Sequence, residues 1–246
     1  MARHHRYPIR IKSAAVSRAR KAWWRLPMLL ALLLLAYLAV AASWAWSAFD
    51  DARRQAPLTE TVELSNRQAA VLLRVEDPDF YGHHGLSLGQ GQGLATISSA
   101  LARELFLGKD RLDGVPGMMQ TFYRSVFACC KRIDLGRDMM ALVLDARMSK
   151  GEQLQRYTAT VYMGTHEGQQ VKGLTQAARS YLGKPLDATT DEEFIRLVAM
   201  IKAPNHYHPA RNPAALDERA ARIQALLLGS CAPDGWFDTD YQGCAS

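Results

Sequence analysis

The 246-residue sequence lacks several patterns that would assign it to a well-defined structural class. It contains no internal repeat and no stretch in which apolar and polar residues alternate over many positions, which argues against an all-β domain. Its four cysteines and seven histidines show no spacing typical of a zinc site. The length suffices for one sizeable domain and a short additional element. The sequence therefore predicts a predominantly α-helical domain that binds no structural zinc.

Acidic residues are missing from positions 1–25, which contain eight basic residues. Removing these eight from the 30 basic residues of the chain leaves 22 against 24 acidic residues, a net charge of −2. The overall charge of +6 therefore belongs to a basic N-terminal arm. Such an arm is compatible with nucleic-acid binding. The segment that follows it points instead to a membrane, so we expect no nucleic-acid partner.

Charged residues are also missing from Leu26 to Ala48. At 1.5 Å per residue these 23 residues span the hydrocarbon layer of about 30 Å as a helix. A cleaved signal peptide ending near Ala41-Ala42-Ser43 is the alternative, but its apolar core would be shorter. Arginines before the run and few after it place the N-terminus in the cytoplasm. Tryptophans lie at the two ends of the run, at Trp23, Trp24, Trp44 and Trp46, where interfacial aromatic residues are expected.

The predicted organisation is thus a single-pass protein of the inner membrane whose main domain is periplasmic. Its parts are a cytoplasmic arm (1–25), a transmembrane helix (26–48), a linker (49–63), a helical domain (64–229) and a tail (230–246).

The four cysteines fit an oxidising compartment. Cys231 and Cys244 bracket the tail, and we expect a disulfide there, worth about 3 kcal/mol in the chain-entropy account. Cys129 and Cys130 are adjacent and are expected to be small apolar core residues.

Capping residues, glycines and prolines delimit the helices of the domain. Ser149–Glu152 and Thr190–Glu193 have the pattern of capping boxes, each of which precedes a helix. The glycine-rich loop 89–93 follows no strand and lacks a Gly-Lys-Thr ending, so it is a weak candidate for phosphate binding. The apolar segment Met118–Cys130 is either a buried helix or one that lies at the bilayer surface. The other predicted helices are 66–74, 96–107, 137–148, 150–164, 174–182, 194–202 and 213–229.

The stretch Val75–Gly85 contains the strongest candidate for catalysis. Pro78 disfavours helix in the residue before it, so the preceding helix should end near Glu76. Such a carboxyl group has an apolar helix behind it and an open loop ahead, which raises its pKa and presents it to a substrate hydroxyl. The alternative is a helix-end acid that pairs with His83 or His84.

Five groups of residues occur in a distinctive order and spacing. They are Glu76-Asp77 with Phe80, His83 and Gly85; Thr96–Arg103 with Leu105–Leu107; Ala141–Arg147 with Ser149-Lys150; Tyr157, Val161–Gly164, Lys172-Gly173 and Tyr181–Lys184; and Ala203-Pro204, Tyr207, Pro209, Arg211–Pro213 and Arg219. Over about residues 60–228 they resemble the family-51 glycosyltransferase domain, which polymerises lipid II into peptidoglycan. The resemblance implies a lysozyme-like helical fold behind a single membrane anchor.

Several positions depart from the family pattern. The family's Gln-Gln pair falls on Ser99 and Ala100, its lysine on Arg103 and its second glutamate on Arg137, next to Asp138. The family's Glu, Asn and Arg in the fourth motif fall on Gln155, Ala159 and Lys172, and the stretch between the first two motifs is shorter than usual.

The resemblance implies that Glu76 takes a proton from the 4-hydroxyl of the acceptor sugar, with Asp138 as the candidate second acid. Cations must stabilise the leaving pyrophosphate, and Arg103 and Lys172 are the candidates. No cofactor is expected, except for a divalent ion, Mg²⁺ or Mn²⁺, that the pyrophosphate would bind. The candidate substrate-binding residues are Asp77, Phe80, His83, Thr96, Arg103 and Lys172.

Three functions remain open from the sequence. The first is a glycan polymerase that uses lipid II and the growing strand, in contact with the inner membrane and cell-wall synthases. The second is a relative that binds lipid II or a synthase without turnover, because several polar family positions have changed. The third is a lysozyme-like hydrolase that uses Glu76 as an acid.

Overall fold

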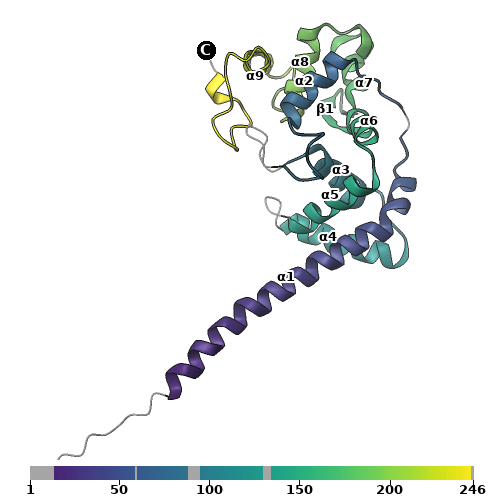
Figure 1. The fold of residues 1–246 in the computed structure, drawn as a ribbon. Coiled ribbons are helices and arrows are strands. Elements are labelled where there is room, and N and C mark those ends of the chain that lie inside the picture. The colour runs from purple at the N-terminus through teal and green to yellow at the C-terminus, as the bar shows by residue number, and fades with distance from the viewer. Residues whose placement is uncertain (1–13, 59, 88–94, 130–133, 245–246) are drawn as a thin grey trace, which may run out of the picture. The chain divides into compact units, whose positions relative to one another are not determined.

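A computed structural model describes residues 14–58, 60–87, 95–129 and 134–244 (Figure 1). Most of the basic arm, the glycine-rich loop 89–93 and Cys130 lie outside these residues. The chain divides into two compact units, residues 1–40 and 41–246.

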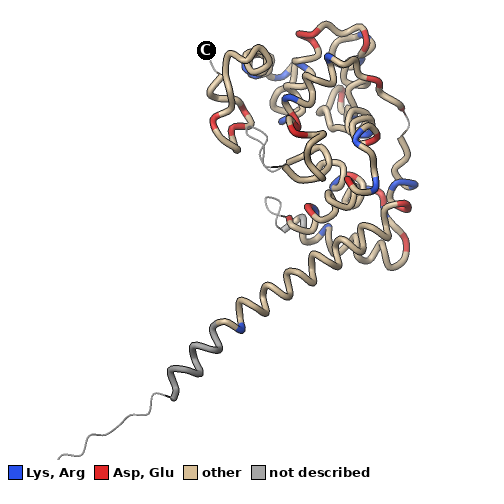
Figure 2. Tube along the Cα trace, in the orientation of Figure 1, with Lys and Arg blue, Asp and Glu red and all other residues tan. Residues whose placement is uncertain are grey.

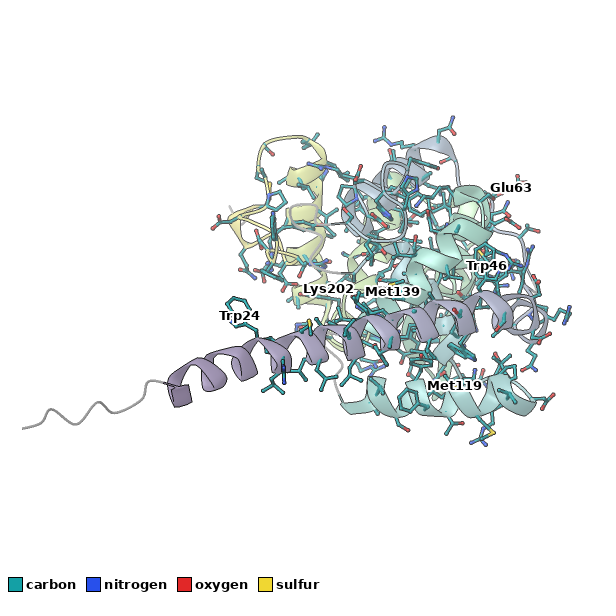
Figure 3. The ribbon with its side chains drawn as sticks, turned by 60° about the horizontal axis from the view of Figure 1, so that its bottom comes forward. Trp24, Trp46, Glu63, Met119, Met139 and Lys202 are labelled. Carbon is teal, nitrogen blue, oxygen red and sulfur yellow. A yellow bond between two sulfur atoms is a disulfide. The ribbon has the colours of Figure 1, made fainter. Side chains whose placement is uncertain are left out.

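The first unit contains the N-terminal part of α1 (Ala14–Gln55). This helix includes a stretch from Trp24 that is long and apolar enough to cross a membrane. Figure 2 shows that the stretch carries no charge over many turns, and its side chains from position 24 to 36 are exposed. An apolar helix without a protein partner is expected in lipid. The structure therefore fits a single-pass membrane anchor, and Trp24 projects from it in Figure 3.

The last turns of α1 belong to the second unit and differ from the predicted lipid-facing helix. One face is buried at a spacing of three and four residues, which is the spacing of an amphipathic helix. This face consists of Ala41, Trp44, Ala45, Ala48, Phe49 and Ala52. At the C-terminal end of the predicted transmembrane segment, one face of the helix is thus buried in protein. Helix α1 also extends seven residues into the predicted linker, to Gln55.

The second unit is predominantly α-helical, as predicted, and is built on α3, which packs against α5 and α6, and on α8, which packs against α2 and α9. The bounds are α2 (Asn66–Glu76), α3 (Ile97–Leu107), α4 (Gly114–Cys129), α5 (Leu135–Arg147), α6 (Lys150–Thr160), β1 (Tyr162–His166), β2 (Gln169–Lys172), α7 (Leu174–Ala177), a π-helical turn (Ala178–Leu182), α8 (Asp191–Ile201) and α9 (Pro213–Leu227).

Local capping chemistry explains where the helices begin. The side chains of Ser65, Ser149 and Thr190 each accept a hydrogen bond from the backbone N–H three residues later. The side chain of that later residue in turn accepts a hydrogen bond from the backbone N–H of the capping residue. Thr96 forms the same box with Ser99 at the start of α3. The starts of α2, α3 and α6 agree with the predicted ones within a residue, because a capping box is set by neighbouring residues alone. Helix α8 begins at Asp191, directly after its capping box and three residues before the predicted start.

The antiparallel hairpin β1–β2 is the main departure from the prediction. Helix α6 ends at Thr160 instead of continuing to Gly164, and Tyr162 pairs with Lys172 across the hairpin. Gly164 and Gly173 have φ of 101° and 79°, which glycine adopts readily and other residues do not. Strands this short contain too few residues for alternation to be recognised.

Helix α4 starts four residues earlier than predicted and has two different faces. On one side Trp44 donates its Nε1–H to the carbonyl of Pro116 (3.1 Å) and stacks on Tyr123 at 5.1 Å between ring centroids. On the other side Val115, Met118 and Phe122 are exposed. The helix is therefore packed on the domain along one face. Its outer face is apolar and exposed, so contact with the bilayer surface stays a prediction.

The predicted disulfide is present: Cys231 and Cys244 are bonded, with their Cα atoms 5.4 Å apart. It closes the segment that follows α9 into a loop.

Candidate active site

Glu76 is the last residue of α2, and the fold of that helix determines where its carboxylate points. Val71, Leu72 and Val75 are buried, and they hold α2 against α8 and α9. Pro78 follows two residues later and cannot continue the helix. The Glu76 carboxylate is left at the edge of the core, where Tyr157 of α6 donates its hydroxyl to Oε2 at 2.8 Å.

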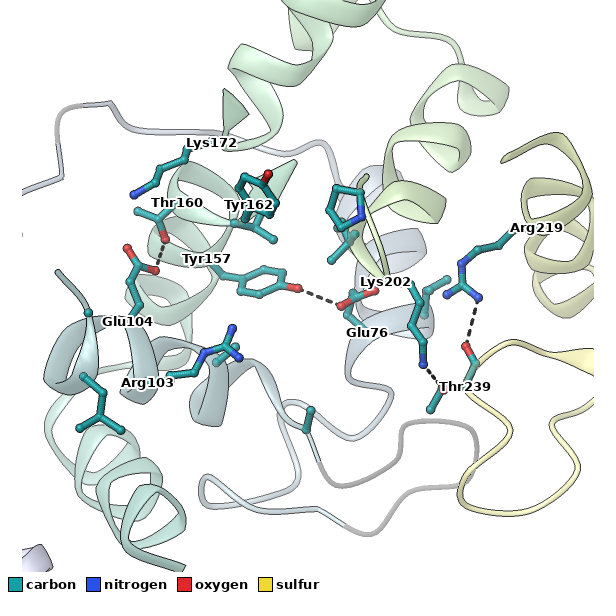
Figure 4. A pocket seen from close by; sticks show the side chains of 18 residues that line it. Glu76, Arg103, Glu104, Tyr157, Thr160, Tyr162, Lys172, Lys202, Arg219 and Thr239 are labelled. Carbon is teal, nitrogen blue, oxygen red and sulfur yellow. Dashed lines mark hydrogen bonds between the residues drawn. The ribbon is translucent and has the colours of Figure 1, made fainter. Parts of the chain in front are cut away.

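The carboxylate faces a cavity of about 650 Å³ (Figure 4). The cavity lies between α2, α3, α6, the hairpin, α8, α9 and the segment after α9. Its charged lining residues are Glu76, Arg103, Glu104, Lys172, Lys202 and Arg219. Residues as far apart in the sequence as Glu76 and Arg219 thus contribute charge to one site.

The surroundings of Glu76 raise the pKa of its carboxyl above the ordinary value of 4.5. Burial is the main cause, because it disfavours the charged form. The hydrogen bond from Tyr157 and the positive charges of Arg219 and Lys202 oppose this effect and lower the pKa. A carboxylate of raised basicity that is open to a cavity has the properties of a general base.

Arg103 and Lys172 line the same cavity as Glu76, as their proposed role requires. Arg103 extends from α3 toward the space beside Tyr157, and Lys172 comes from the end of β2 (Figure 4). The sequence prediction grouped both with Glu76, and the structure brings the three together. Two cations in a cavity with one base can bind an anionic leaving group.

Glu104 is a lining residue that the sequence interpretation missed. It accepts a hydrogen bond from the hydroxyl of Thr160 at 2.5 Å and lies between Thr160 and Arg103 in Figure 4. The only signal was an acid directly after Arg103 on a largely apolar helix. Lys202 and Arg219 were likewise not predicted to lie beside Glu76, because they come from helices far along the chain.

Asp77 points away from the cavity into a buried cluster. Its side chain is 0% exposed, and His83 Nε2 lies 3.0 Å from each carboxylate oxygen. The backbone N–H of Ile97 donates to Asp77 at 2.9 Å, and that of Gly85 donates to His83 Nδ1 at 2.9 Å. Since Nδ1 accepts a bond, His83 carries its proton on Nε2 and donates to Asp77.

Phe80, His83 and Thr96 are also buried, at 1%, 6% and 2% exposure. Thr96 donates its hydroxyl to the carbonyl of Gly85 at 2.6 Å and caps α3. None of the four predicted contacts Asp77, Phe80, His83 and Thr96 lines the cavity. Enclosed by protein, these side chains fix the loop after Glu76 in this structure, and their direct contact with a substrate stays a prediction.

The geometry bears on two further predictions. The alternative that Glu76 pairs with His83 or His84 is wrong, because Glu76 bonds to Tyr157 and His84 lies 3.6 Å from Asp145. Asp138 does not line the cavity; its carboxylate is paired with Arg137 on the same helix at 2.8 Å.

The described residues contain no group of three or more His, Cys, Asp and Glu side chains arranged to hold a metal ion. The acids of the cavity are accompanied by arginines and lysines, which repel a cation. These residues therefore do not fit a protein-held metal site.

Comparison with known proteins agrees with the motifs. The Transglycosylase family matches residues 45–227. Penicillin-binding protein 1B of Vibrio cholerae is 31% identical over 171 residues, 64% of this chain and 20% of that protein. Its counterpart in Escherichia coli is 31% identical over 159 residues, 63% of this chain and 18% of that protein. The chain thus spans about a fifth of these relatives.

A relative of more similar size is a Cupriavidus necator protein described as a transglycosylase, 27% identical over 170 residues, which are 64% of each chain. The family match covers well over half of the present chain and includes Glu76 and the residues around it. This chain therefore belongs to the transglycosylase family, the family-51 glycosyltransferases that its motifs resemble.

Proposed function

We propose that this chain is a peptidoglycan glycosyltransferase that joins lipid II units into a glycan strand. The observation that carries the proposal is the Glu76 carboxylate, which faces a cavity that also contains Arg103 and Lys172. Burial raises the pKa of this carboxyl, which suits it to accept a proton from a sugar hydroxyl. Membership in the transglycosylase family supports the same chemistry.

In the proposed step Glu76 removes the proton from the 4-hydroxyl of the acceptor sugar. The oxygen then forms a bond to the anomeric carbon of the donor strand, from the side opposite the leaving group. The bond from that carbon to the pyrophosphate oxygen breaks, and its electron pair leaves with undecaprenyl pyrophosphate. The configuration at the anomeric carbon is inverted.

Arg103 and Lys172 are proposed to bind the pyrophosphate. Negative charge grows on this group as the bond breaks, so fixed cations stabilise the transition state more than the ground state. An arginine presents two parallel donors to a phosphate, which makes Arg103 suitable in place of a lysine. A divalent ion bound by the pyrophosphate itself stays a prediction, and no step depends on it.

The proposal places residues 1–25 in the cytoplasm and the cavity outside the inner membrane, where lipid II is used. The charge asymmetry across the apolar stretch supports this orientation. A reporter that is active only outside the cytoplasm, fused after Ser246, should be active. A silent reporter, with an active cytoplasmic one at the same site, would reverse the orientation.

The second candidate function is a relative that binds lipid II without turnover. It is favoured by Arg137, which occupies the position of the family's second glutamate and is paired with Asp138. Cell-wall synthases are the partners proposed for such a protein. The third candidate function is a lysozyme-like hydrolase. A single experiment distinguishes the three candidates.

The deciding experiment incubates the purified full-length protein with lipid II in detergent micelles and separates the products by length. We expect strands of many disaccharides from the wild type and none from Glu76→Gln. Lipid II that binds to both proteins without strand formation would establish the binding role. Cleavage of preformed glycan strands, without polymerisation, would establish a hydrolase.

A further inference from the structure

The segment that follows α9 contributes Thr239 to the lining of the cavity. We call residues 230–244 the C-terminal loop. The Cys231–Cys244 disulfide closes it, and the Asp238 carboxylate orders its interior by accepting the N–H groups of Asp234 (3.0 Å) and Gln242 (2.9 Å). The family match ends at residue 227, so the loop is an addition to the matched domain.

The tip of the loop contacts the two cations nearest to Glu76. The hydroxyl of Thr239 accepts a hydrogen bond from Lys202 Nζ, and its carbonyl accepts one from Arg219 at 3.1 Å. Arg219 also pairs with the Asp240 carboxylate at 3.2 Å. Thr239 itself lines the cavity. Figure 4 shows Thr239 below both cations and Glu76 to their left.

A second contact ties the loop to the chain directly before Glu76. Tyr241 is 2% exposed and donates its hydroxyl to the carbonyl of Val75 at 2.9 Å. Carbonyls in the last turn of a helix have no partner within the helix, so this bond satisfies one at the end of α2. The Arg219 guanidinium lies 5.6 Å from the Tyr241 ring, which adds a cation–π contact.

We propose that the C-terminal loop is part of the active site, in which Thr239 and Asp240 are positioning residues that hold Lys202 and Arg219 beside Glu76. Without the loop, Arg219 keeps a bond to the carbonyl of Ala199 and its contact with the Tyr207 ring. Lys202 would lose the hydroxyl that fixes its ammonium group. The loop therefore determines how much positive charge faces the base.

This inference deepens the proposed function, because it concerns the same carboxylate. Lys202 and Arg219 favour the ionised form of Glu76 and oppose the effect of burial. If the loop releases them, the pKa of Glu76 should rise and the base should be protonated over a wider range of pH. The other groups that face Glu76 are Tyr157 of α6, Tyr241 of the loop and Asp77, and the cavity adds Arg103, Glu104 and Lys172.

The test compares full-length Thr239→Val and Asp240→Asn with the wild type. Carbon-13 NMR of labelled glutamate carboxyls, with Glu76→Gln for assignment, follows the titration of Glu76 directly. We expect a higher pKa of Glu76 in Thr239→Val, because Lys202 loses its partner, and a lower pKa in Asp240→Asn, because a carboxylate no longer offsets the charge of Arg219. In the polymerisation assay, kcat/KM of Thr239→Val on the acidic side of the pH profile should fall about three- to tenfold, with a smaller loss at high pH.

Matched variants separate positioning from folding. Thr239→Ser keeps the hydroxyl and should titrate like the wild type, and so should Phe237→Ser, whose ring is exposed on the same loop. Replacing Cys231 and Cys244 by serine should raise the pKa of Glu76 if that variant folds. Coincident titration curves for the wild type, Thr239→Val and Asp240→Asn would overturn the inference. The titration does not need turnover, so an inactive wild type would reject the proposed function alone.

Discussion

Two neighbouring acids, Glu76 and Asp77, lie in opposite environments. The Glu76 carboxylate faces a cavity and has one hydrogen bond to a side chain, from Tyr157, among the described residues. Asp77 is enclosed and accepts bonds from His83 and from the backbone of Ile97. The Glu76 carboxylate is accessible from the cavity, whereas the Asp77 carboxylate has a structural role in the loop after α2. Residue type alone does not separate the two roles.

The difference arises where α2 ends. Asp77 has left the helical conformation (φ −158°, ψ 76°), so its side chain leaves the helix on a different side from that of Glu76. It meets the N-terminus of α3, where free N–H groups and the helix dipole favour an anion. The side chain of Glu76 points instead toward α6, α8 and α9. Substitutions can test this difference between the two carboxylates.

Removing the base should have the largest effect. Glu76→Gln keeps the shape of the side chain but cannot accept a proton, and loss of a general base costs on the order of 10² to 10⁴ in rate. Lipid II should still bind, because Glu76 is proposed to act on the acceptor hydroxyl and not on the pyrophosphate. Strand formation and lipid II binding, measured on the same preparation, check both expectations.

The same variant should be more stable than the wild type at neutral pH. Burial raises the pKa of Glu76, so the folded state disfavours the charge, and wild-type stability falls as pH rises through that raised pKa. Glu76→Gln removes this loss. Its Tm should exceed that of the wild type at pH 7 and match it below pH 4.

Equal strand-forming activity of the wild type and Glu76→Gln would remove Glu76 from the mechanism.

Breaking the buried pair should reduce stability. Asp77→Ala leaves His83 and the N–H of Ile97 without their partner, and removing one member of a buried pair costs about 3 kcal/mol or more. Urea unfolding followed by circular dichroism measures the free energy of unfolding. Asp79→Ala, at an exposed site in the same loop, is the matched control. Similar losses in the two variants would mean that the buried cluster does not hold the loop.

Weakening the support of Glu76 should give a smaller effect. Tyr157→Phe removes the hydroxyl that stabilises the ionised carboxylate, so the pKa of Glu76 should rise further. The activity profile should then move to higher pH, with about a tenfold loss at low pH. Tyr181→Phe, which loses a bond to the carbonyl of Met163 instead, is the control. An unshifted profile in Tyr157→Phe would contradict the role of this hydrogen bond.

The smallest effect is expected from Asp138→Asn. The side chain lies outside the cavity lining and is paired with Arg137, so the rate should change by about twofold or less. The assay is strand formation from lipid II beside Glu76→Gln. A larger loss from Asp138→Asn than from Glu76→Gln would return Asp138 to the role of second acid.

The sequence by itself determined what depends on neighbouring residues. The charge asymmetry and the apolar run predicted an anchor, and a helix long and apolar enough for one is present. Capping boxes at Ser149 and Thr190 each predicted that a helix follows, and the structure confirms both helices. The order of motifs gave the family and Glu76, and the spacing of Cys231 and Cys244 gave the disulfide. All of these signals act over a few residues or a single segment.

Only the tertiary structure decided which side chains share the cavity. Asp77, His83 and Thr96 belong to the motifs but are buried, because α3 covers the loop after α2. Lys202, Arg219 and Thr239 belong to distant segments, and α8, α9 and the C-terminal loop bring them to Glu76. The hairpin that carries Lys172 was also missed. Side-chain direction and long-range packing are not encoded in local spacing, so the sequence identified Glu76 as the candidate base and only the fold determined which side chains surround it.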